Sequence, residues 1–312
     1  MKLLLRAIVK NLIRPLKKLV FVILAFYGLG NISGFGQTNM LDSLLVDSAE
    51  LPIQYIEATF KATRIINGQS CETTPIGTLD FRIAHRFAPV NGGTYNLFGL
   101  DQASTKFSFD YGITKEFTVG VGRSTYEKTY DGFVKYKFLK QRESGFSPIS
   151  AVWLSSMSIN TLRWADPNRT NYFTSRLNFV HQLLVARKVN ENFSFQLTPT
   201  LIHRNLVSTF DEDNDVLAIG IGLRQKLTKR TSINIEYFYP QRTSIQDRYK
   251  NSLSIGFDIE TGGHVFQLHF TNSTAMIEKA FIAENTQSWK NAGFMFGFNI
   301  SRVFTLKSYD YE

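Results

Sequence analysis

Five histidines are the side chains in this sequence best suited to acid–base or metal chemistry: His85, His181, His203, His264 and His269. A zinc site would need ligands at short spacings such as HxH, HExxH or CxxC, because these bring two donors to the same metal ion. None of these spacings occurs in the sequence. The sequence therefore predicts no metal site, and we interpret the histidines as interfacial side chains or as hydrogen-bonded groups inside the fold.

A hydrolase would require a serine within hydrogen-bond reach of a histidine, with a third group orienting that base. Neighbouring strands would bring Ser254 and His269 together, but serine is abundant and no GxSxG turn occurs. The patterns Gly120-x-Gly122 and Gly220-x-Gly222 match fragments of a phosphate-binding loop, yet neither opens a helical pattern. Alternating glycines in a strand instead thin a wall or permit curvature. We therefore predict neither enzymatic activity nor a cofactor.

Charged side chains at alternate positions of otherwise apolar or small-residue segments are the remaining candidates for a functional site. They are Asp80, Arg82, Lys106, Asp110, Lys135, Lys137, Arg176, Arg204, Arg224, Lys226, Glu236, Asp258 and Glu260. If these eight bases and five acids line a closed lumen, two interpretations follow. They form a ladder of opposed charges that braces the interior, or they line a pore with a weak preference for anions. The sequence leaves both open.

The elements that would position these charges are strands with a period of two residues, which recur from about Pro52 to Phe304. The clearest is Thr105–Ile113, in which aromatic and branched residues alternate with lysine, serine, aspartate and glycine. A turn at 114–116 leads into 117–122, where phenylalanine and valine alternate with threonine and glycine. This is a hairpin with one apolar face and one face of small or polar residues.

Connection lengths also alternate along the chain. Short turns near residues 114, 190, 229 and 262 alternate with long polar connections at 206–215, 240–250 and 273–291. Short turns on one rim and long loops on the other are typical of outer-membrane barrels, in which they are periplasmic and extracellular respectively. A soluble β-sandwich gives no reason for this segregation.

Thirteen segments fit the strand pattern, of which Tyr55–Ile66 is the first. A single-chain bacterial barrel has an even number of strands, so one of these segments must be wrong. We expect it to be the first, because Glu57, Lys61 and Arg64 blur its two faces. The sequence thus predicts an all-β fold, an antiparallel up-and-down transmembrane β-barrel of about 12 strands, with roughly 10 to 14 compatible with the chain length.

The N-terminal residues predict export. Six bases precede an apolar run at 19–29, and Gly34 and Gly36 supply small residues before a cleavage site at Gln37. The apolar run is too short to span a bilayer as a helix. We therefore predict a signal peptide over residues 1–36, a short mature N-terminal segment over 37–52 and a barrel domain over 53–312.

The formal net charge of +9 does not indicate a nucleic-acid partner. Without the six bases of the signal peptide, 29 bases remain against 26 acids. The single cysteine, Cys71, lies far from the cleavage site, so the sequence predicts neither a lipid anchor there nor an internal disulfide.

Several stretches resemble an uncharacterised family of β-barrel proteins from Bacteroidota-type bacteria, a domain of unknown function. They are Leu79–Phe87, Asn91–Gln102, Asp110–Ser124, Asp131–Lys137, Ile255–Asn272 and Phe296–Phe304. The resemblance covers most of the mature chain and implies an outer-membrane barrel. It implies no substrate, activity or catalytic residue.

The function that we expect is passive passage of small solutes across the outer membrane, with lumen charges biasing selection and outer-membrane lipid as the surroundings. Two alternatives remain. One is a non-conducting structural or binding barrel that displays its extracellular loops, and the other is a soluble exported β-sandwich.

Overall fold

The structure is a computed structural model that describes residues 54–143, 147–242 and 248–308. The predicted signal peptide, residues 1–36, and the predicted segment 37–52 lie outside the described residues. Within the described ranges, no helix is both long enough and apolar enough to cross a membrane.

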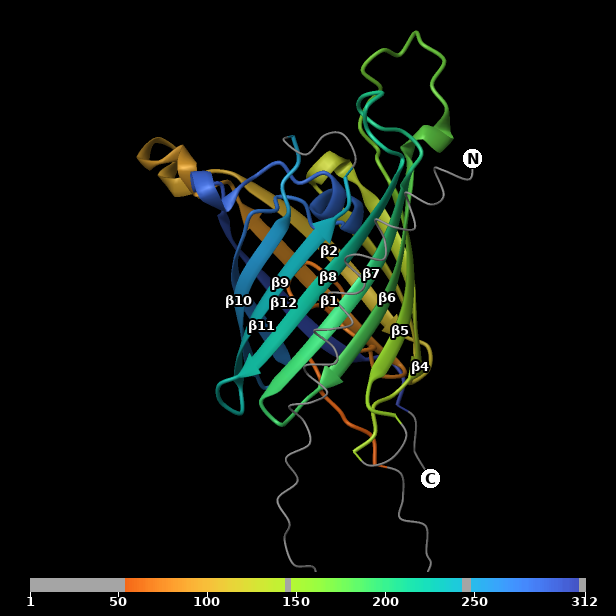
Figure 1. Ribbon diagram of the computed structural model, residues 1–312, viewed down its shortest axis with the longest axis vertical. Helices are drawn as coiled ribbons and strands as arrows, with labels where there is room; N and C mark the ends of the chain where they lie inside the picture. Colours follow the sequence, from red (N-terminus) through yellow and green to blue (C-terminus); the bar gives the residue numbers. More distant parts are fainter. Residues whose placement is uncertain (1–53, 144–146, 243–247, 309–312) are drawn as a thin grey trace, which may run out of the picture. The chain divides into compact units, whose positions relative to one another are not determined.

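Twelve antiparallel strands form a closed barrel, in which each strand pairs with its neighbours in the sequence and β1 pairs with β12 (Figure 1). The strands are β1 (Thr78–Phe87), β2 (Ala103–Gly112), β3 (Phe117–Ser124), β4 (Tyr130–Leu139), β5 (Ser150–Ile159), β6 (Leu177–Lys188), β7 (Phe193–Arg204), β8 (Asp215–Lys226), β9 (Thr231–Pro240), β10 (Ser252–Thr261), β11 (His264–Thr271) and β12 (Met295–Thr305). The predicted fold class and strand number are confirmed. Because the barrel is closed, no strand has an unpaired edge. Strands inside a bilayer need this pairing, because the bilayer offers their backbone groups no other partners.

The two faces of the wall differ as the period of two predicts. On β2, Phe107 and Phe109 point outward and are each 44% exposed. Lys106, Ser108 and Asp110, which alternate with them, are buried. Neighbouring strands align like faces, since Phe109 lies opposite Phe81 on β1 and Asp110 opposite Asp80. The outer face is therefore apolar and aromatic, and the inner face is polar or small.

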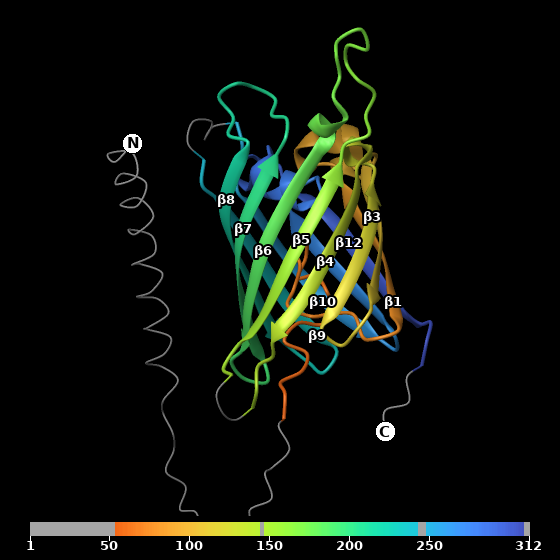
Figure 2. The same cartoon turned by 90° about the vertical axis from the view of Figure 1, so that its right-hand side faces the viewer.

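Most connections segregate by length between the two rims (Figure 2), with two exceptions: the short connection 125–129 lies at the long-loop rim, and the longer connection between β4 and β5 lies at the short-turn rim. Turns at 113–116, 189–192, 227–230 and 262–263 form the short-turn rim, where Gly262 and Gly263 adopt positive φ angles of 26° and 107°. Longer connections at 88–102, 160–176, 205–214, 241–251 and 272–294 form the long-loop rim. In outer-membrane barrels these rims face the periplasm and the exterior respectively.

Residues 59–74, which precede β1, form a hairpin inside the barrel and no wall strand, so the first of the thirteen candidates was the false one. The Ile65 N–H donates to the Gly68 carbonyl (2.9 Å) and the Ser70 N–H to the Thr63 carbonyl (3.0 Å). We call residues 59–74 the lumen hairpin. Both of its ends lie at the short-turn rim, where Ile56 donates to the Gln141 carbonyl and Gly77 to the Gly112 carbonyl.

A second segment folds into the barrel from the opposite rim. Residues 273–287 of the connection between β11 and β12, here called the lumen loop, include the π-helical turn η5 (Lys279–Ala283), which is buried throughout. Phe281 of this turn packs edge-on against Phe238 of β9, with ring centroids 5.2 Å apart. The apolar core thus lies inside the barrel, between the wall and the two inserted segments.

Candidate functional site

The tip of the lumen hairpin is held by one carboxylate of the wall. Glu236 of β9 accepts hydrogen bonds from the backbone N–H groups of Ile66 (3.2 Å), Asn67 (3.2 Å) and Gly68 (2.8 Å). Bonds to a charged acceptor contribute about 1.5–3 kcal/mol each, and the N–H groups would otherwise be buried without partners. A Cβ at Gly68 would lie 2.9 Å from the Phe238 ring, so glycine permits this close approach.

Cations of the wall bind the hairpin through its carbonyl oxygens. Lys135 Nζ of β4 donates to the carbonyls of Thr63 (3.3 Å), Ser70 (3.1 Å) and Glu72 (2.9 Å). Arg224 of β8 donates to the carbonyls of residues 58 and 59, both at 3.2 Å. These cations are buried, and the carbonyls replace the water that would hydrate them in an open lumen.

Three amide side chains of the wall add further contacts to the hairpin backbone. Gln267 donates to the Ile65 carbonyl (2.9 Å), Asn299 to the Ile66 carbonyl (3.0 Å) and Gln196 to the Gln69 carbonyl (2.8 Å). The wall therefore contacts the backbone of the hairpin more than its side chains. Apolar packing is added by one small cluster in which Phe60, Ile65, Ile66 and Cys71 meet Val152, Leu184 and Ala186 of the wall.

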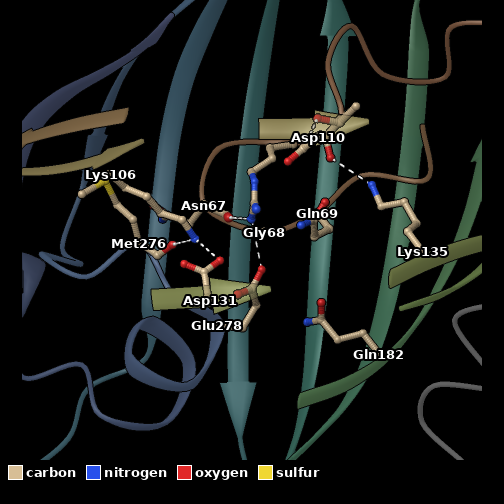
Figure 3. A network of polar contacts seen from close by, with 12 residues as sticks. Asn67, Gly68, Gln69, Lys106, Asp110, Asp131, Lys135, Gln182, Met276 and Glu278 are labelled. Atoms are coloured by element: carbon tan, nitrogen blue, oxygen red, sulfur yellow. Dashed lines mark hydrogen bonds and ion pairs between the residues drawn. The ribbon is translucent and has the colours of Figure 1, made fainter. Parts of the chain in front are cut away.

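The two inserted segments meet inside the barrel (Figure 3). Arg64 of the hairpin donates from Nη1 to Oε1 of Glu278 in the lumen loop at 3.0 Å, and both side chains are buried. Lys106 of β2 lies beside this pair, where it bonds to Asp131 (2.7 Å) and to the Met276 carbonyl (3.3 Å). The Arg64–Glu278 ion pair thereby joins two segments that enter the barrel from opposite rims.

The lumen loop has its own ionic contacts with the long-loop rim. Lys279 pairs with Glu284 (2.7 Å) and with Glu127 (3.1 Å), and Arg204 pairs with Glu284 (3.1 Å). Burial alone would lower the pKa of Lys279, but these two carboxylates raise it above its ordinary value. Burial alone would raise the pKa of Glu278, but the charges of Arg64 and Lys106 hold it below its ordinary value. Both groups are therefore charged at neutral pH.

Nine of the thirteen predicted lumen charges are buried on the wall: Asp80, Arg82, Lys106, Asp110, Lys135, Arg204, Arg224, Glu236 and Asp258. Lys137 and Glu260 lie nearer the short-turn rim, where they pair with Glu72 and Lys61 of the hairpin. Lys226, the last residue of β8, is partly exposed.

Arg176 lies apart from the rest of the predicted set. Alternation predicts Arg176 on a strand, but the chain at Phe173–Arg176 is a 3-10 turn and β6 begins only at Leu177. The Arg176 guanidinium stacks on the ring of Trp164, which lies in the long connection between β5 and β6, at 3.8 Å from the ring centre.

Several residues of the lumen were not among the predicted ones. Arg86, which bonds to the Asn67 side chain at 2.9 Å, has the same parity on β1 as Asp80 and Arg82, so alternation alone signals it. Asp131 likewise shares the parity of Lys135 on β4. Nothing in the local pattern signals Arg64 or Glu278, because neither lies on a strand of the wall.

Ser254 and His269, the pair considered for catalysis, do not bond to each other. Strand register places His269 opposite Gly256 and Ser254 opposite Thr271, and the Ser254 hydroxyl bonds to Thr271 (2.8 Å) and to Asn67 (2.8 Å). Neither ring nitrogen of the buried His269 has a hydrogen-bond partner among the described residues, unlike the bonded state expected for it. The described ranges contain no group of three or more metal-ligating side chains.

Comparison with known proteins places the chain in a family. The family profile of a "membrane bound beta barrel domain (DUF5777)" matches residues 60–304, a range that includes nearly all of the lumen hairpin. No characterised protein matches significantly in sequence.

Several solved structures are similar to the chain at low sequence identity and with TM-scores below 0.5. The NanC porin is 7% identical (TM-score 0.47, 73% of this chain and 98% of that chain), and the KdgM porin is 10% identical (TM-score 0.45, 73% and 99%). An outer-membrane channel from Pseudomonas putida F1 is 14% identical (TM-score 0.41, 75% and 97%). With its closed apolar-faced barrel, the chain is an outer-membrane β-barrel protein and belongs to the DUF5777 family of membrane-bound β-barrel domains.

Proposed function

We propose that this protein is a passive channel for small hydrophilic solutes, and that the described state is its closed state. The observation that carries the proposal is the lumen hairpin, which occupies a space that the wall itself leaves free. Inward positions of the wall include glycines, and a Cβ at Gly222 would lie 2.2 Å from Cδ1 of Ile65. A barrel that is filled by its own wall has no such inserted segment to displace.

The contacts of the hairpin suit displacement. Glu236, Lys135 and Arg224 bind backbone groups, and water can take the place of each partner when the hairpin leaves. Because both ends of the hairpin lie at the short-turn rim, it can withdraw on the periplasmic side without threading past the wall.

The charges that line the emptied lumen indicate the class of solute. The inward-facing cations of the wall are Arg82, Arg86, Lys106, Lys135, Arg204 and Arg224, and its inward-facing acids are Asp80, Asp110, Asp131, Glu236 and Asp258. This balance favours small hydrophilic solutes with a weak preference for anions, since charged rings set the selectivity of a pore. The channel would act without energy input and without chemistry on the solute.

A non-conducting binding barrel is the second candidate. The buried ion pairs that fix both inserted segments support it, because they fill the lumen in the described state. We also infer a Bacteroidota-type bacterium as the source, from the sequence resemblance, and removal of residues 1–36 during export, from the basic and apolar residues of the N-terminus.

Solute flux into proteoliposomes tests the proposal. The full-length protein is compared with a chain that begins at Pro75 behind a standard export signal, and heat-modifiable gel mobility verifies that both barrels are folded. We expect slow entry of small sugars and amino acids through the full-length protein and rapid entry through the shortened one, with anions favoured. Equal impermeability of both folded proteins would support the non-conducting barrel instead.

A further inference from the structure

A groove lies on the outer face of the barrel at the long-loop rim. It has a volume of about 430 Å³ and lies between the ends of β9 and β10 and the turn η6 (Trp289–Asn291). Tyr237, Tyr239 and Leu253 line it from the outward-facing side of their strands, and Tyr239 is 56% exposed. The groove therefore opens on the outer face, where the barrel emerges from the outer leaflet.

The described lining residues of the groove carry net positive charge. Arg242, Lys250 and Lys290 are among its lining residues, and none of its twelve described lining residues is acidic. Polar but uncharged groups such as Asn251 and Ser288 add hydrogen-bonding capacity. Such a set complements an anion with several oxygen acceptors, for which a phosphate group is the fitting chemistry.

The walls of the groove are held in place before any ligand arrives. The Arg242 guanidinium donates to the Asn251 side chain (2.9 Å) and to the carbonyls of Tyr249 (3.4 Å) and Lys250 (3.3 Å). The Trp289 indole N–H donates to the Leu253 carbonyl (3.0 Å), which ties η6 to the barrel. A preformed site binds without the cost of ordering its own side chains.

An apolar projection continues from the groove. The turns η1 (Val90–Gly92) and η2 (Thr94–Gly99) lie beside η6, since Val90 donates to the Phe294 carbonyl (2.9 Å) and Asn91 to the Ala292 carbonyl (3.1 Å). Both turns and η6 project sideways beyond the wall at the long-loop rim (Figure 1). Tyr95 is 93% exposed, and Leu97 and Phe98 are each more than half exposed. Exposed aromatic and apolar side chains at this rim fit contact with lipid.

We propose that this groove binds the phosphorylated headgroup of an outer-leaflet lipid. The cations take the phosphate, while the aromatic wall of the groove and the apolar projection take the adjoining part of the lipid. A lipid is favoured over free phosphate because the groove is continuous with the lipid-facing surface through Tyr239 and Leu253. The proposal rests on the outer-membrane location and is independent of whether the lumen conducts.

Lipid titration of the purified protein in neutral detergent tests this, with binding followed by native mass spectrometry. The probes are diphosphorylated lipid A, the same lipid without phosphates, and inorganic phosphate. The variant K250Q/K290Q removes two charges of the groove, and K229Q/R230Q removes two charges from the short-turn rim as a matched control. Heat-modifiable mobility verifies folding, and K290Q alone, which alters an exposed side chain, replaces the double variant if that variant fails to fold.

We expect lipid A to bind at least tenfold more tightly than its dephosphorylated form, and K250Q/K290Q to weaken it about tenfold to thirtyfold while the control changes it less than twofold. Equal weakening in both double variants would overturn the proposal, because it would reveal nonspecific attraction. Inorganic phosphate that competes with lipid A at equal concentration would also overturn it and assign the groove to a soluble anion.

Discussion

Arg64 and Glu278 form a buried ion pair at 3.0 Å between two segments that enter the barrel from opposite rims. The pair joins residues that are 214 positions apart in the sequence, and it is the direct ionic contact between the lumen hairpin and the lumen loop. Removal of one partner from a buried pair costs about 3–5 kcal/mol, since the other charge stays buried without compensation. Closure of the lumen from the two sides is therefore coupled.

The first prediction concerns this coupling. Glu278→Gln leaves the Arg64 guanidinium with a neutral partner, so the hairpin should leave the lumen more often. Cys71 reports this, because it is buried in the hairpin and is the chain's single cysteine. Because the glutamine still offers Arg64 a neutral acceptor, we expect a smaller loss than complete removal of the partner, about 1.4–2.8 kcal/mol, and reaction of Cys71 with a small thiol reagent should accelerate about tenfold to a hundredfold.

The second prediction is the pH dependence of the same contact. The pKa of Glu278 is held below its ordinary value, so its contribution to closure is complete at neutral pH and is lost as the pH falls through that depressed pKa. The reactivity of Cys71, divided at each pH by that of a small free thiol toward the same reagent, should rise in the wild type on acidification below the ordinary pKa of a glutamate. Glu278→Gln should show a weaker rise, and identical profiles for the two proteins would contradict the assignment.

The third prediction concerns the carboxylate that holds the tip of the hairpin. Glu236→Gln keeps the size of the side chain but removes the charge that accepts three backbone N–H groups. The loss of about 1.5–3 kcal/mol should accelerate modification of Cys71 at least tenfold. Glu191→Gln, in an exposed turn of the short-turn rim, is the matched control and should leave the rate unchanged.

The fourth prediction tests the position of the hairpin against the wall. Gly222→Val should push on Ile65, whose Cδ1 lies 2.2 Å from the position of a Cβ there, and so loosen the hairpin by about 1–3 kcal/mol. Ile65→Ala relieves that overlap. In a double-mutant cycle on Cys71 reactivity, the combined effect should be smaller than the sum of the two single effects by about 1 kcal/mol or more. Additive effects would instead place Ile65 away from this wall.

The sequence predicts the wall far better than its contents. Period-two alternation identifies inward charges such as Asp80, Lys135 and Glu236 because each strand has only two faces, and membrane and lumen select opposite residue types for them. The same pattern extends the strand at Arg176 too far, because alternation does not register that the backbone there turns as a 3-10 helix.

Alternation of side chains does not predict the lumen hairpin. Its backbone is bound by the wall through Glu236, Lys135 and Gln267, so its side chains need no periodicity. Loss of alternation around Lys61 and Arg64 is the one local signal, and it marks the segment as a false strand without giving its location. The partners of Arg64 depend on register around the whole barrel and on the fold of a distant loop, which local pattern does not encode.

Single-channel conductance in planar bilayers tests whether the lumen hairpin closes the barrel. The full-length protein and the chain that begins at Pro75 are reconstituted under the same conditions after their folding has been verified. We predict that the full-length protein is closed with brief openings, and that the shortened barrel gives a stable open state with weak anion preference. A folded, shortened barrel that stays silent, or a full-length protein that conducts as well as the shortened one, would contradict closure by the lumen hairpin.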